Sequence, residues 1–155
     1  MKMFQLLLGI GKKRLALLFI AIVLLVLIYS FQQVSYFDIL NVFQIKRYPN
    51  LVFVINKSIR LVLNDFACLL IIYALFQERK YLVFGSIIQL IEVFILMPIY
   101  FIIKLRFEGD SEISSPLLSQ IHRLIVNPVL MLLFITGLLL QKYRILNASD
   151  ENNSP

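Results

Sequence analysis

The chain is poor in cysteine, glycine and charged residues, and each shortage excludes a class of protein. Its one cysteine, Cys68, excludes an intrachain disulfide and a cysteine-based metal cluster. The five glycines form no phosphate-binding loop, and neither an HExxH nor a GxSxG motif occurs. Only 15% of the residues are charged and 60% are hydrophobic, which is outside the range of soluble domains. We therefore expect a membrane protein without catalytic residues, cofactor or metal.

Basic residues outnumber acidic ones by 15 to 9, and most of them lie in short gaps between apolar runs. Loops that meet lipid headgroups have this pattern. The formal charge of +6 therefore indicates a lipid bilayer as partner rather than a nucleic acid.

Four apolar runs are long enough to cross a bilayer as helices. A helix rises about 1.5 Å per residue and the hydrocarbon core is about 30 Å thick, so a span needs about 20 mostly apolar residues. The expected spans are residues 15–31, 57–76, 81–103 and 122–140. They predict an all-α fold, an integral membrane bundle of four transmembrane helices in a single domain, residues 1–146.

The flanks of the spans refine this prediction. No cleavage site follows the first apolar run, so we interpret it as an uncleaved membrane helix and not a signal peptide. Pro98 and Pro128 fall inside the third and fourth spans and predict kinks there. The last residues, 147–155, are polar and predict a disordered tail.

Four spans place both termini on one side of the membrane. The tight basic hairpin at residues 77–80 and the cluster at residues 12–14 favour the cytoplasmic side, because charges close to span ends weigh most. The loop at residues 104–120 also contains three acidic residues, which suits the outer face. We expect both termini to be cytoplasmic.

Residues 32–56, between the first two spans, are not apolar for long enough to make another crossing. Residues 36–43 predict a short amphipathic segment in the membrane interface. Pro49 and Asn50 mark a turn. Residues 51–55 then form either the early part of the second helix or a dip into the membrane surface.

An internal repeat is suggested by the second and fourth spans. A shift of 63 residues aligns Arg60 with Arg123 and Asn64 with Asn127. The repeat would make two related helical hairpins that follow one another in parallel. The alternative is chance similarity between two lipid-facing, leucine-rich helices.

Polar side chains inside the spans mark the candidate site, because they usually face a bundle interior, a cavity or a partner. At about 100° per residue, Gly85, Gln89 and Glu92 share one narrow face, which is typical of a helix-packing seam. The candidate residues for polar packing or partner binding are Arg60, Asn64, Asp65, Gln89, Glu92, Arg123 and Asn127.

Two arrangements of these residues are open. Arg60 and Arg123 stand at the outer ends of their helices, where long side chains can reach lipid headgroups. Alternatively, both arginines, both asparagines and Glu92 form a polar cluster near the outer leaflet, although Glu92 should lie about two helical turns deeper. Asp65 lies about 140° around the helix from Arg60 and would point at a neighbouring span.

A family pattern runs through residues 36–142. Its segments are Tyr36–Asp38, Ile59–Asn64, Ile71–Phe76, His122–Pro128 and Gln141–Lys142. They resemble the exosortase F system-associated proteins, which are small multi-pass membrane proteins of flavobacteria. The resemblance implies a bacterial inner (cytoplasmic) membrane and an exosortase-type system that sorts proteins at the cell envelope. The resemblance does not make the chain the exosortase itself. An exosortase needs a catalytic set of Cys, Arg and His, and here the one cysteine, Cys68, and the one histidine, His122, lie on different predicted helices.

These patterns favour one function and leave a second open. The first is a non-enzymatic accessory protein that packs against a membrane partner, such as an exosortase, through the face of Gly85, Gln89 and Glu92. The alternative is a small-molecule or proton-handling membrane protein that uses Glu92 with Arg60 or Arg123.

Overall fold

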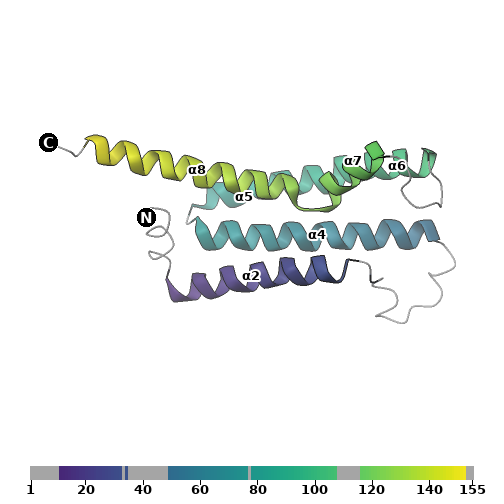
Figure 1. Ribbon diagram of the computed structural model, residues 1–155, viewed down its shortest axis with the longest axis horizontal. Helices are drawn as coiled ribbons and strands as arrows, with labels where there is room; N and C mark the ends of the chain where they lie inside the picture. The colour runs from purple at the N-terminus through teal and green to yellow at the C-terminus, as the bar shows by residue number, and fades with distance from the viewer. Residues whose placement is uncertain (1–10, 33, 35–48, 77, 108–115, 153–155) are drawn as a thin grey trace.

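The computed structural model describes residues 11–32, 34, 49–76, 78–107 and 116–152, and within them every regular element is a helix (Figure 1). The elements are α2 (Lys12–Ser30), α4 (Pro49–Leu75), α5 (Arg79–Ile91), the π-helical turn η2 (Glu92–Leu96), α6 (Met97–Phe107), α7 (Pro116–Val126) and α8 (Val129–Asn152). The all-α prediction is confirmed for this part of the chain.

Three of the described helices are long and apolar enough to cross a membrane: α2, α4, and the continuous helix formed by α5, η2 and α6. α7 and α8 together also suffice, although they are bent by 56° at their junction. The described residues thus contain three helices long and apolar enough to cross a membrane, or four if the bent pair is one span. Successive helices alternate in direction, so the start of α2 and the end of α8 lie at the same end of the bundle (Figure 1).

The second helix starts earlier than predicted, at Pro49. Residues 51–55 are therefore the first turns of α4, and the alternative of a separate dip into the membrane surface is wrong. Phe53 in this stretch packs edge-on against Phe101 of α6, with 6.1 Å between ring centroids. This contact joins residues far apart in sequence. Local composition therefore could not decide whether residues 51–55 belong to the second helix. The predicted amphipathic segment at residues 36–43 lies outside the described residues.

The last helix is longer than predicted. α8 continues to Asn152, whereas a disordered tail was expected from residue 147. Extending an existing helix costs far less than starting one, so a polar stretch can continue a helix that the membrane span has already nucleated. Residues 153–155 of the predicted tail lie outside the described part of the chain.

The two prolines inside spans disturb their helices in different ways. Before Pro98 the chain forms the wide turn η2, in which the Met97 N–H donates to the carbonyl of Glu92, five residues earlier. A wide turn of this kind relieves the clash between a proline ring and the preceding helical turn. Pro128 separates α7 from α8 and accompanies the 56° bend. The predicted kink at Pro128 is confirmed.

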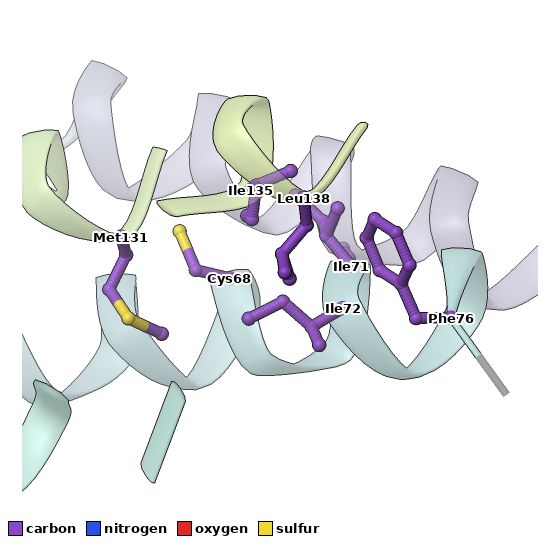
Figure 2. Packing of buried hydrophobic residues seen from close by; sticks show 8 residues of the cluster. Cys68, Ile71, Ile72, Phe76, Met131, Ile135 and Leu138 are labelled. Atoms are coloured by element: carbon purple, nitrogen blue, oxygen red, sulfur yellow. The ribbon is translucent and has the colours of Figure 1, made fainter. Parts of the chain in front are cut away.

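The core consists of two apolar clusters. In the first, residues of α4 and the residue that follows it face residues of α8: Cys68, Ile71, Ile72 and Phe76 against Met131, Ile135 and Leu138 (Figure 2). The second cluster joins α4, α6 and α7 through Leu61, Met97, Tyr100, Ile125 and Val126. Along α4, Asn64 and Asp65 fall between the residues of the two clusters. Polar groups therefore occupy the junction between two apolar regions.

Candidate functional site: a polar clamp, a carboxyl pair and a basic cavity

A polar clamp, formed by Arg60, Gln32 and Asn127, ties three parts of the chain together. Arg60 Nη2 donates to Gln32 Oε1 at 3.0 Å, just beyond the end of α2. The same nitrogen donates to Asn127 Oδ1 at 2.9 Å, at the break between α7 and α8. Arg60 itself is buried. Its guanidinium thus connects α4 to two segments that the sequence does not place beside it.

Asn64, one turn further along α4, stabilises the same break. Its Nδ2 donates to the backbone carbonyl of Val126 at 3.2 Å, and both residues are buried. Val126 is the last residue of α7, and carbonyls at a helix end lack partners in the helix's own hydrogen-bond ladder. Asn64 therefore supplies a donor that the interrupted helix needs.

The two aligned Arg-x-x-x-Asn segments thus contact each other, but they do not occupy equivalent environments. Arg60 is buried, whereas Arg123 is exposed. The first segment lies inside the continuous helix α4, and the second ends in the break after Val126. Of the polar cluster expected near the outer leaflet, the structure brings together Arg60, Asn64 and Asn127.

Glu92 takes no part in the polar clamp. It interacts with Asp65 of α4, and the expected pairing with Arg60 or Arg123 is replaced by this carboxyl pair. Arg60 lies inside α4 and donates to Gln32 and Asn127 instead, whereas Asp65, five residues further along the same helix, is the residue that meets Glu92. Asp65 does point at a neighbouring span, as its angular position on α4 predicted.

The carboxyl pair is fully enclosed. Asp65 and Glu92 are each 0% exposed, and within the described residues none of their four carboxyl oxygens has a hydrogen-bond partner. Both also lie within electrostatic range of the buried Cys68 thiol. A carboxyl group in such surroundings is costly, and two carboxylates side by side repel each other. Protonated carboxyl groups are therefore favoured over two carboxylate anions in this pair.

The predicted seam of Gly85, Gln89 and Glu92 packs inside the molecule. A Cβ atom at Gly85 would lie only 2.9 Å from Leu69 Cδ2 and 3.0 Å from Ile72 Cδ1. The missing side chain lets α5 approach α4 closely. Gln89 is half-buried and Glu92 is enclosed. This corrects the expectation that the seam contacts a partner, because α4 of the same chain already covers it.

A cavity of about 480 Å³ opens beside the polar clamp. Its basic lining residues are Lys57, Arg60 and Arg123, with His122. Its neutral polar lining comes from Tyr29, Gln32 and Asn127. Sequence reasoning had selected three of the seven, namely Arg60, Arg123 and Asn127. The other four were not selected, because Tyr29 and Gln32 lie at the end of an apolar run, and Lys57 and His122 lie near the expected starts of their spans, where polar residues are common in membrane helices.

His122 is held in place by aromatic neighbours. Its Nδ1 shares a 2.7 Å hydrogen bond with the hydroxyl of Tyr100, which is fully buried on α6. Its ring also stacks on Phe53 of α4, with 6.5 Å between centroids. The Nζ of Lys104 lies 4.7 Å from the centroid of Phe53. These contacts fix one wall of the cavity by joining α4, α6 and α7.

Comparison with protein-family models, with curated proteins and with solved structures found no match to this chain. The function must therefore be inferred from the sequence resemblance and from the geometry of the polar clamp, the carboxyl pair and the cavity.

Proposed function

We propose that the chain is a non-enzymatic accessory protein of a bacterial inner membrane, associated with an exosortase-type envelope protein-sorting system. The family pattern in Ile59–Asn64 and His122–Pro128 supports this context. The observation that carries the accessory role is the polar clamp together with Asn64, because Arg60 and Asn64 connect helices to each other. Polar groups used in this way build a stable framework on which a partner can dock.

The proposal includes four crossings with both termini in the cytoplasm, the bent pair α7 and α8 making the fourth. The common end shared by the start of α2 and the end of α8 supports an even number of crossings (Figure 1). The basic residues at that end, Lys12–Arg14, Arg79, Lys80, Lys142 and Arg144, support a cytoplasmic location for it.

The partner would bind the outward face of the α5–η2–α6 helix. This face carries large exposed apolar side chains, including Phe84, Phe94 and Ile102, and Phe94 is 70% exposed. Aromatic side chains on a helix surface provide large contact areas for another helix within the bilayer.

Site-specific photo-crosslinking tests this proposal. A photoreactive amino acid at Phe94 should give a covalent adduct with one membrane protein of the sorting system in cells of the source type. The same amino acid at Ile72, which is fully buried, should give none. Adducts at Phe94 with lipid alone, together with a lone protein after purification in mild detergent, would contradict the accessory role.

A second candidate function is proton handling, in which Asp65 rather than an arginine is the partner of Glu92. The enclosed carboxyl pair favours it, because adjacent carboxyl groups can pass one proton between them: one gives up the proton as the other accepts it. The wide turn η2 begins at Glu92 itself, and such turns are frequent at functional sites.

Proton flux into liposomes tests the second candidate. Vesicles containing the full chain and a trapped pH-sensitive dye should acidify under an imposed potential. Glu92→Gln and Asp65→Asn should each reduce the rate to that of empty vesicles, whereas Gln89→Ala, one turn away, should leave it unchanged. Equal rates for the unmodified protein and empty vesicles would exclude proton handling.

A further inference from the structure

We propose that the cavity beside the polar clamp binds a phosphate-bearing anion, either a lipid headgroup or a soluble phosphate. This inference does not depend on the accessory role or on proton handling. It rests on the charge, the hydrogen-bond donors and the depth of the cavity.

Among the described residues, the charged side chains that line the cavity are all basic. Lys57, Arg60 and Arg123 contribute three cations, and none of the seven lining residues is acidic. Like charges that converge on one cavity repel each other, so an anion placed among them removes an unfavourable interaction as well as adding attraction. Phosphate suits such a site, because a planar guanidinium can donate two parallel hydrogen bonds to its oxygens, as it can to a carboxylate, and the remaining phosphate oxygens can accept from the other donors.

The neutral lining residues also present donors. The amide oxygens of Gln32 and Asn127 accept from Arg60, so the groups that each amide has left to offer a ligand are its two N–H donors. The Tyr29 hydroxyl can donate as well. The Nδ1 of His122 is engaged by Tyr100, and its Nε2 is a donor in the tautomer in which the Tyr100 hydroxyl donates to Nδ1. A ligand rich in acceptor oxygens fits this set.

The length of α2 indicates the depth of the cavity in a bilayer. With Lys12 and Lys13 at one membrane surface, the 19 residues of this helix would span about 28 Å. Tyr29 and Gln32 at the other end of α2 therefore reach the opposite surface, since the hydrocarbon core is about 30 Å thick. A cavity of about 480 Å³ at that level is large enough for a phosphate and its ester substituent.

Ligand-induced stabilisation of the purified full chain tests the proposal. Unfolding can be followed with a thiol-reactive dye, because Cys68 is the one cysteine and is fully buried. In neutral detergent, phosphatidylglycerol or inorganic phosphate should raise the unfolding temperature saturably, relative to phosphatidylcholine or chloride at equal ionic strength. Native mass spectrometry should detect one bound equivalent. A response to phosphatidylglycerol alone identifies a lipid headgroup, and a response to phosphate as well identifies a site open to soluble anions.

Variants that remove equal charge distinguish binding in the cavity from a general attraction of anions to a basic protein. The double variant Lys57→Gln/Arg123→Gln should weaken binding at least tenfold, because it removes two of the three lining cations. The control Arg106→Gln/Arg144→Gln also removes two cations, from exposed positions outside the cavity lining, and should bind as the unmodified protein does. Should the Lys57 change impair folding, Arg123→Gln alone, at an exposed residue, should still weaken binding several-fold. Absence of saturable binding, or equal weakening by the control, would overturn the proposal.

Discussion

Replacing Asn64 by leucine is expected to lower the free energy of unfolding by about 1–3 kcal/mol. Leucine has a similar shape, so the change removes a hydrogen-bond donor without opening a large cavity. The carbonyl of Val126 then loses the bond that Asn64 Nδ2 makes to it at 3.2 Å, in a buried position at the end of α7. A buried acceptor without a donor costs more than the bond itself contributed. Titration with a denaturing detergent, monitored by helical circular dichroism, measures the difference.

Thr136→Val is the matched control. Thr136 also donates to a backbone carbonyl, that of Leu132 at 2.8 Å, but it does so within α8 and is exposed. Its replacement should change the free energy of unfolding by no more than about 0.5 kcal/mol. If Asn64→Leu were as stable as the unmodified protein, the Asn64 side chain would not secure the break between α7 and α8, and the polar clamp alone would hold it.

Removing the carboxyl pair is expected to have the opposite effect. The double variant Asp65→Val/Glu92→Met should raise the free energy of unfolding by about 1–4 kcal/mol, the gain found when well-packed apolar residues replace buried charged groups that are ion-paired. Four enclosed carboxyl oxygens without hydrogen bonds among the described residues impose a desolvation cost. Valine and methionine remove that cost and can join the apolar clusters on either side. The same denaturation measurement applies.

The isosteric pair Asp65→Asn/Glu92→Gln separates polarity from shape. It keeps the size of both side chains and leaves polar groups in place, so it should change stability much less than the apolar pair. A loss of stability in the apolar pair would mean that the carboxyl groups hold the helices together. A gain in stability accompanied by loss of proton flux would mean that the protein retains a costly pair because its function requires it.

The sequence predicted what depends on composition and local order. The apolar runs predicted the membrane-crossing helices, and Pro128 predicted the bend in the last one. Angular positions on single helices were also reliable, because Asp65 does face a neighbouring span. The identity of that neighbour could not be predicted, since it depends on how helices assemble. Helix assembly determines both the pairing of Glu92 with Asp65 and the contact of Arg60 with Gln32.

The basic cavity shows the same limit. Its lining comes from the end of α2, from α4 and from α7 with the break that follows it. Lys57 and His122 each resemble ordinary residues of a membrane interface when they are considered alone. They line the same cavity because of the bend at Pro128 and the ring contacts of Phe53. The spacing of residues along the sequence indicates neither feature.

The wide turn η2 has a consequence for how this chain is compared with others. A π-helical turn contains one residue more than an α-helical turn. Glu92 and Tyr100, eight positions apart and both fully buried, can therefore share the face that Gly85 and Glu92 share at a spacing of seven. A relative with a regular α-helix here would be one residue shorter in the middle of a membrane span. Aligning the two would require a gap where gaps are normally penalised most, and an alignment without one would match the wrong faces beyond Glu92.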